Sequence, residues 1–374
     1  IKEASKSILT ISDEKTDADT SGGDTFSAFQ QKRWHQLSGS ESADTKFSII
    51  VPVHNEERSL PSFLGALLLS EIPITADVLI VFVINASTDK SADLIKRRLA
   101  WICPPIEVSF PESQYDPNRS NVIYRVRCRS LKFFVVETPT PGKANALNLG
   151  NEIVFQQGYK VAMNIDANNW VEPDSIALMY KKARELILSQ QESEVVIINS
   201  KEYCPTRRDQ TEVSVKPKVQ KAEVTGCMFA WDTHWIEENH GFPQKAVEDY
   251  GTGLLALSQK KVIAESDAKI WVFTPSNPFD ENRQMIRFIY GAMQLAREFA
   301  GDPVAISILL EDFPHLRPIR DRFHLYFSRK AGQPMGPFRA VLRWLFNEFL
   351  IFQARRKLKK DPDGQTWEPI RSTK

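Results

Sequence analysis

The segment "DVLIVFVIN", residues 77–85, is an unbroken apolar run, rich in β-branched residues, that ends in an asparagine. Such a run is typical of a strand buried on both faces of a sheet. Similar runs occupy residues 47–53, 132–138, 159–166 and 194–199. Helical patterns alternate with them at Arg58–Ser70, Ser91–Trp101, Lys143–Gln156 and Asp174–Gln190. This alternation predicts an α/β protein with a mostly parallel sheet.

The overall composition is that of a soluble globular protein. The chain has 374 residues, of which 42% are hydrophobic and 25% charged, with a formal net charge of +1. A balance this close to neutral gives no reason to expect a nucleic-acid partner. The four cysteines form no CxxC pair, so we expect neither a zinc ribbon nor a disulfide framework. No uncharged run approaches the roughly 18–20 residues of a membrane span, and a reduced, cytoplasmic setting fits best.

Changes in residue composition along the chain suggest the boundaries between its regions. Residues 1–45 are polar and predict a mobile lead-in. The proline-containing stretch 102–131 predicts an inserted loop. Residues 219–273 suggest further strands with a helix near 248–260, and the pattern from Glu281 onward is helical and basic.

Polar residues follow several of the predicted strands. They are Pro52–Glu57, Asn85–Asp89, Pro141–Asn145 and Asp166–Asn169. In open α/β sheets, ligands bind beyond the carboxyl ends of the strands. We therefore expect these four segments to converge at one edge of the sheet.

Eight segments occur in an order that is informative. They are "VPVHNEE", "INASTDKS", "PGKANALNLG", "DAN", "VTGCMFAW", "HGF", "VEDYGTGLLAL" and "QMIRF". In content and order they resemble the family 2 glycosyltransferases over about residues 47–290. The resemblance implies a GT-A (Rossmann-like) fold with helices on both faces of the sheet and a C-terminal helical extension. It divides the chain into a nucleotide-sugar half (46–200), an acceptor half (201–280) and a helical region (281–374).

The resemblance also implies a function. We expect an inverting glycosyltransferase of the hexosyltransferase type, acting in polysaccharide or glycoconjugate biosynthesis. Its donor would be a nucleotide-diphosphate sugar, with UDP as the nucleotide, and its acceptor a glycan, a lipid-linked molecule or a small molecule. Two other classes remain open: a GT-A domain that only binds nucleotide or glycan, and a sugar-phosphate nucleotidyltransferase. The segment "VPVHNEERS" lacks the Gly-rich loop usual in the latter.

The donor site is implied residue by residue. The residues expected to bind the nucleotide sugar are Pro52, Val53, Asn55, Glu56, Asn85, Lys143, Asn145, Asp166, Ala167 and Gln284. Asn85 stands where the family usually has an acid, and an amide supplies the same acceptor. Lys143 opens a helix, where free N–H groups also favour an anion. The alternatives are capped helix starts at "HNEE" and "INASTDKS" and a solvated lysine.

A metal is implied at "DAN". Asp166, Ala167 and Asn168 occupy the family's acid-any-acid motif. In the family the last acid ligates Mg²⁺ or Mn²⁺, and the first contacts the ribose or a metal-bound water. Hard cations prefer charged oxygen ligands, and Asn168 offers only a neutral carbonyl. We therefore expect Asp166 and Asn168 to bind a divalent cation weakly. The alternative is a turn that ends a strand.

The expected catalytic residues lie further along the chain. Asp249 of "VED" is the implied general base, and Glu248 would orient the loop or the acceptor. In "QMIRF", Gln284 and Arg287 share a helix face, and Arg287 would neutralise the leaving diphosphate. A helix-capping acid pair and an ordinary helix face are the alternatives.

Residues 339–360 form a long helical pattern with a basic end. Leu342, Leu345, Phe346 and Phe349 recur at helical spacing. We expect this face to pack on the protein. The alternatives are peripheral contact with the inner face of a membrane and pairing with another chain.

Overall fold

The computed structural model describes residues 46–72, 76–102, 106–108, 123–128, 131–189, 194–205, 210–212, 222, 224–272, 277–327 and 337–364. The predicted lead-in, 1–45, lies outside the described residues.

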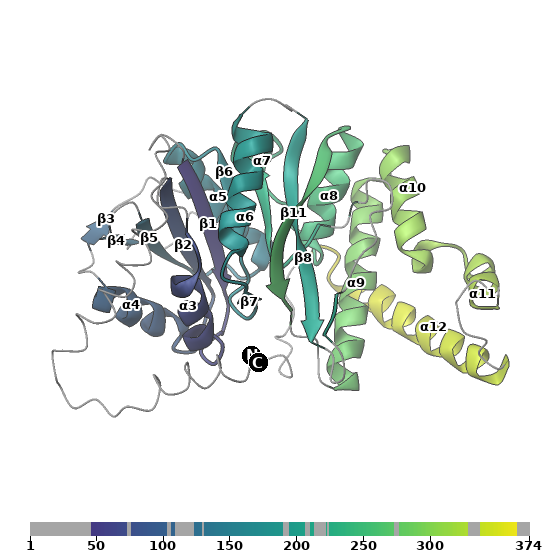
Figure 1. Ribbon diagram of the computed structural model, residues 1–374. Helices are drawn as coiled ribbons and strands as arrows, with labels where there is room; N and C mark the ends of the chain where they lie inside the picture. Colours follow the sequence, from purple (N-terminus) through teal and green to yellow (C-terminus); the bar gives the residue numbers. More distant parts are fainter. Residues whose placement is uncertain are drawn as a thin grey trace.

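Four parallel strands form the centre of the sheet. In spatial order they are β5 (Leu131–Thr138), β2 (Asp77–Asn85), β1 (Lys46–Val53) and β6 (Val161–Asn164). The intervening helices are α3 (Leu60–Leu69), α4 (Ser91–Ile102) and α5 (Lys143–Gln156). Eight of the nine residues of β2 are buried, which is why its sequence is continuously apolar. The predicted α/β fold with a parallel sheet centre is confirmed (Figure 1).

Antiparallel pairs extend the sheet beyond β6. There, β10 (Phe229–Asp232) runs antiparallel to both β6 and β8 (Val195–Pro205). Next to β8 lie β11 (Val262–Trp271), which is parallel to it, and β9 (Gln210–Glu212), which is antiparallel. The short β7 (Trp170–Val171) pairs with β11. One sheet thus connects the two predicted halves.

The prediction of an inserted loop at 102–131 is wrong in part. Strands β3 (Ile106–Val108) and β4 (Ile123–Cys128) pair antiparallel with each other, and β4 pairs with β5. The β4 sequence "IYRVRC" places arginines at alternate positions, a period-2 pattern typical of a strand, and β4 lies next to the edge strand β3. The nearby prolines obscured that pattern.

Two apolar layers cover the sheet. Alternate residues of β1 point to opposite faces: Phe47, Ile49 and Val51 join the cluster under α3, α4 and α6 (Ser175–Ala183), whereas Ile50 joins the cluster under α5 and α7 (Thr233–Glu238). A π-helical turn, Arg184–Leu188, continues α6. The second cluster packs α5 against the sheet and thereby positions Lys143, the first residue of α5.

The C-terminal helical extension is also confirmed. After α8 (Glu248–Ser258), four helices follow β11: α9 (Pro278–Glu298), α10 (Pro303–Asp312), α11 (Ile319–Phe327) and α12 (Pro337–Lys360), with a 3₁₀ turn at Pro314–Leu316. Helices α8, α9 and α10 share one apolar cluster, and α9 and α12 share another. In Figure 1, α12 crosses α9 near one end and extends away from the sheet, and α11 lies beside its other end.

The predicted packing face of α12 is wrong. Leu342, Leu345, Phe346 and Phe349 are exposed, and the residues buried against α9 are Leu350, Ile351 and Ala354. Because α12 is apolar on much of its circumference, the sequence did not reveal which side meets α9. Among the described residues, no helix combines the length and apolarity needed to cross a membrane.

Close contact between α5 and β1 can be tested at Gly150. A Cβ on this residue would lie 2.5 Å from Ile50 Cγ2, in the fully buried core. Gly150→Ala should therefore lower the free energy of unfolding by about 1–3 kcal/mol, as overpacking does. Gly65→Ala on α3 is the control, because nothing lies within 4 Å of its added Cβ, and it should stabilise by about 0.5–1 kcal/mol. Equal stability of the two variants in urea titrations would contradict this packing.

Candidate active site

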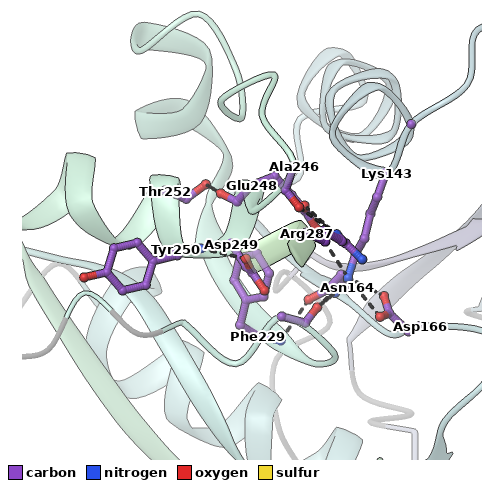
Figure 2. A network of polar contacts seen from close by, with 12 residues as sticks. Lys143, Asn164, Asp166, Phe229, Ala246, Glu248, Asp249, Tyr250, Thr252 and Arg287 are labelled. Atoms are coloured by element: carbon purple, nitrogen blue, oxygen red, sulfur yellow. Dashed lines mark hydrogen bonds and ion pairs between the residues drawn. The ribbon is translucent and has the colours of Figure 1, made fainter. Parts of the chain in front are cut away.

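Side chains from four elements meet beyond the carboxyl end of β6. Asp166 lies two residues after β6, and Lys143 is the first residue of α5. Glu248 and Asp249 are the first two residues of α8, and Arg287 lies within α9. Figure 2 shows these side chains directed toward one another. The structure thus brings together residues more than a hundred positions apart, as the sequence predicted.

Lys143 and Asp166 form a close ion pair. Lys143 Nζ lies 2.7 Å from Asp166 Oδ1 and 2.9 Å from Oδ2, and it donates to the Gly226 carbonyl at 2.7 Å. Burial by itself lowers the pKa of Lys143, but Asp166 and Glu248 outweigh it and raise the pKa above its ordinary value. Lys143 therefore stays charged throughout the physiological pH range.

Glu248 lies between two cations. Its residue is only 3% exposed, with Oε1 3.6 Å from Lys143 Nζ and Oε2 3.7 Å from Arg287 Nη2. Its backbone carbonyl accepts a hydrogen bond of 2.7 Å from Thr252 Oγ1. A buried carboxylate is tolerated when opposite charges compensate its lost hydration. Glu248 thereby connects α5, α8 and α9 through charge.

Helix α9 also holds the backbone just before Glu248. Arg287 Nε donates to the Ala246 carbonyl at 2.8 Å, and Gln294 Oε1 accepts from the Ala246 N–H at 3.1 Å. A Cβ on Gly291 would come within 2.6 Å of Val247 Cγ2, so the helix and this loop are in close contact. The position of Glu248 and its neighbour is therefore set by α9.

Asp249 is the carboxyl group of this site best suited to exchange a proton. Its Oδ1 accepts from the Tyr250 N–H at 2.8 Å. Burial first, and then the Glu248 carboxylate, raise the pKa of Asp249 to about 6. A base of that pKa is ionised at neutral pH and still has useful proton affinity. Burial also raises the pKa of Asp166, but the Lys143 ammonium opposes that rise and occupies its oxygens.

Gly226 contacts three residues of the candidate site and was not among the predicted site residues. Its carbonyl accepts from Lys143 Nζ and from Asn164 Nδ2 at 2.8 Å. A Cβ at Gly226 would overlap Asp249 Oδ2. Asn164, fully buried, in turn accepts from the Phe229 N–H at 2.9 Å. An asparagine ending an apolar strand was the one local signal for this connection.

The loops after β1 and β2 are linked to each other. Asn55 adopts a positive φ of 54°, and its Oδ1 accepts from the Thr88 N–H at 2.8 Å. The Glu56 N–H donates to Ser91 Oγ at 2.9 Å. Helix α3 begins at Leu60, so Asn55 does not cap it and instead joins the two loops. Of the other predicted residues here, Pro52 is half-buried and Val53 is fully buried.

Asn85 leaves one buried acceptor unused. Its Nδ2 donates to the Gly142 carbonyl at 3.2 Å, whereas its Oδ1 is buried without a hydrogen-bond partner among the described residues. Buried polar atoms are seldom left unpaired, so Asn85 Oδ1 is an acceptor whose hydrogen-bonding capacity is unmet among the described residues. Nearby, Asn145 Nδ2 donates to the Pro141 carbonyl at 2.6 Å and holds the turn before α5.

The remaining predicted residues differ in burial. Ala167 is buried, Asn168 is half-buried, and Gln284 is half-buried one turn before Arg287 on α9. The structure places Gln284 on the same helix as Arg287, as predicted.

The residues predicted to hold a metal do not fit a resident divalent cation. The Lys143 ammonium lies within 2.9 Å of both Asp166 oxygens, and Asn168 adds no charge. Over the part of the chain that the structure describes, no group of three or more His, Cys, Asp or Glu side chains could hold a metal ion. A cation would have to compete with Lys143 for the one available carboxylate.

Comparisons with known proteins place the fold. No family model and no curated protein matches the sequence. A solved mannosyltransferase, PcManGT from Pyrobaculum calidifontis in complex with GDP-Man and Mn²⁺, matches with a TM-score of 0.52 and 16% identity, over 91% of this chain and 92% of that chain. TarS 1–349 from S. aureus in complex with UDP matches at 0.44 and 14% identity, over 88% and 95%. The chain thus has the fold of the mannosyltransferase.

The contact between Gly226 and Asp249 can be tested by substitution. Gly226→Ala should turn the Asp249 carboxylate away while leaving the fold intact. The atom nearest to the added Cβ is Asp249 Oδ2, at the end of a side chain that can rotate. A displacement of about 1 Å can cost about a hundredfold in rate, so we expect kcat to fall at least about tenfold. Gly301→Ala, where the added Cβ meets nothing within 4 Å, is the control. An unchanged kcat in Gly226→Ala would show that this contact does not position Asp249.

The effect of Asn168 on metal binding is measurable without an activity assay. Asn168→Asp would place a second carboxylate near Asp166, and ligand charge raises affinity for hard cations. Calorimetric titration of Mn²⁺ in the presence of UDP should show at least about tenfold tighter binding than wild type, and Asp166→Ala should bind most weakly. If all three proteins gave the same titration, "DAN" would not be where the cation binds.

Proposed function

We propose that this protein is an inverting glycosyltransferase that moves a sugar from a nucleotide-diphosphate donor, with UDP as the preferred nucleotide, to an acceptor hydroxyl. The observation that carries the proposal is Asp249. It is a carboxylate with a pKa of about 6, beside a paired cluster of Lys143, Asp166, Glu248 and Arg287. A base next to two fixed cations is what transfer from a diphosphate requires.

The donor would lie over the carboxyl ends of β1 and β2. The linked loops there, with Pro52, Val53, Asn55 and Glu56, would contact the base and ribose, and the unused Asn85 Oδ1 would accept a base N–H. The diphosphate would lie at the N-terminus of α5. Residues 46–200 would then bind the nucleotide sugar, 201–280 the acceptor, and 281–374 would form the helical extension.

The transfer would be a single displacement. The acceptor oxygen attacks the anomeric carbon while Asp249 takes its proton. The bond from that carbon to the diphosphate oxygen breaks, and its electron pair leaves with the diphosphate. Lys143 and Arg287 stabilise the charge that grows on this leaving group, an electrostatic effect strongest where the cations are fixed beforehand. Glu248 holds Lys143 and Arg287 in place, and its negative charge compensates part of their positive charge before the donor binds.

Nucleotide release tests the proposed function. UDP and GDP sugars are offered with a panel of acceptors, with and without Mn²⁺, and free nucleoside diphosphate is measured. The proposal expects sugar-dependent release that requires an acceptor. Tight nucleotide binding without any turnover would instead identify a binding module.

Replacing the base should separate chemistry from binding. Asp249→Asn cannot accept the proton but keeps the shape of the side chain. We expect turnover to fall at least about a hundredfold, with UDP affinity measured by calorimetry within a few-fold of wild type. A variant that turned over like wild type would show that another group is the base.

The pH dependence of both activity and stability follows from the same group. Only ionised Asp249 can take the proton, so kcat/KM should rise with pH through about 6. The folded pKa lies above the unfolded value of about 3.9, so Asp249 contributes stability at low pH that is lost as pH rises from about 4 to about 6. The difference in Tm between Asp249→Asn and wild type should therefore grow across that interval. A constant difference from pH 4 to 8 would contradict the raised pKa.

A further inference from the structure

Helix α12 has an exposed apolar face. The exposed side chains are Val341 (38%), Leu342 (50%), Leu345 (50%), Phe346 (46%), Phe349 (54%) and Phe352 (60%). At 3.6 residues per turn they lie along one side of the helix. Large apolar side chains gathered in this way on one surface usually mark an interaction site.

Toward the C-terminal end of α12, the same side of the helix carries positively charged side chains. Arg356 follows Phe349 by seven residues and Lys359 follows Phe352 by seven, so two turns bring each onto the apolar side, and both are exposed. Lys360, four residues after Arg356, lies there as well. Glu348 is the only acidic residue in the sequence of α12, and it is paired with Arg322 of α11 at 2.6 Å. The exposed face is therefore apolar along most of its length and basic at one end.

The opposite side of α12 is fixed to the protein. Leu350, Ile351 and Ala354 pack with Ile289 and Tyr290 of α9 in one buried cluster. The Tyr290 hydroxyl donates to the Asp361 and Gly364 carbonyls just after α12, and Lys357 Nζ lies 5.5 Å from the Tyr290 ring centre. Because these contacts hold α12 on α9, the apolar face stays directed away from the protein.

We propose that this face of α12 docks onto the surface of an anionic lipid bilayer, with the helix lying in the plane of the interface. The apolar side chains would enter the boundary between headgroups and acyl chains, and Arg356, Lys359 and Lys360 would meet the anionic headgroups. The positive charges of this face complement an anionic bilayer, and this is why we propose a bilayer as the partner. A second copy would offer the same basic residues and no acidic partner on this face. The proposal stands on α12 alone and does not depend on the proposed enzymatic activity.

Vesicle co-sedimentation of the full chain tests the proposal. The probes are vesicles of phosphatidylcholine alone and of phosphatidylcholine with about a third phosphatidylserine. We expect at least about tenfold stronger binding to the anionic vesicles, because each basic residue near such a surface adds to the attraction. Added salt should weaken that binding.

Two sets of variants identify the surface. Leu345→Glu with Phe349→Glu should lower vesicle binding at least about tenfold, whereas Val304→Glu on α10, an equally exposed apolar position at 52%, should not. Arg356→Gln, Lys359→Gln and Lys360→Gln together should remove the preference for anionic vesicles. Lys160→Gln, Lys181→Gln and Lys260→Gln together, all exposed and away from α12, are the control matched for charge.

Two results would overturn the proposal. One is binding that the α12 variants leave unchanged, which would place the membrane contact elsewhere. The other is absence of binding to both vesicles. If the protein then dimerised in sedimentation equilibrium, and Leu345→Glu with Phe349→Glu abolished the dimer, the face would be an interface between copies.

Discussion

The arrangement of the candidate site depends on the buried carboxylate of Glu248. It lies within 3.7 Å of both Lys143, on the sheet-packed helix α5, and Arg287, on α9 of the C-terminal extension. Removing one member of such a buried set leaves the others uncompensated, which is more costly than the pair is stabilising. The close contacts at Gly226 and Gly291 then fix the backbone around it. The same few residues thus set both the position of the Glu248 carboxylate and the charge around it.

Two neighbouring carboxyl groups lie in different environments and would have different roles in the proposed reaction. Glu248 faces two cations. Asp249 is directed toward Gly226, and its hydrogen-bond donor within the described residues is the backbone N–H of Tyr250. Burial first, and then repulsion from the Glu248 carboxylate, raise the pKa of Asp249. Environments that separate the pKa values of adjacent acids are a common way to divide structural and proton-transfer roles.

Local sequence patterns predicted most of the fold and the place of the site. The apolar runs of β1, β2 and β5 are buried strands. The polar segments after β1 and β2 are joined by hydrogen bonds, Asn85 reaches the turn before α5, and Lys143 at the start of α5 pairs with Asp166 after β6. Contacts made by backbone groups were not predictable from side-chain patterns. Examples are the Gly226 carbonyl, which accepts from Lys143, and the Ala246 N–H, which donates to Gln294. The packed side of α12 was missed because an apolar helix does not specify its neighbour. The tight pairing of Lys143 with Asp166, which disfavours a resident metal, also depends on the folded geometry.

The central claim is that Glu248 holds the cations of the site and raises the pKa of Asp249. Carbon-13 NMR titration of the Asp249 carboxyl group, in wild type and in Glu248→Gln, tests it directly. The account predicts a midpoint of about 6 in wild type and a clearly lower midpoint in the variant, where one negative neighbour is lost and two cations remain. An unchanged midpoint, or a wild-type midpoint near the ordinary value of about 3.9, would contradict it.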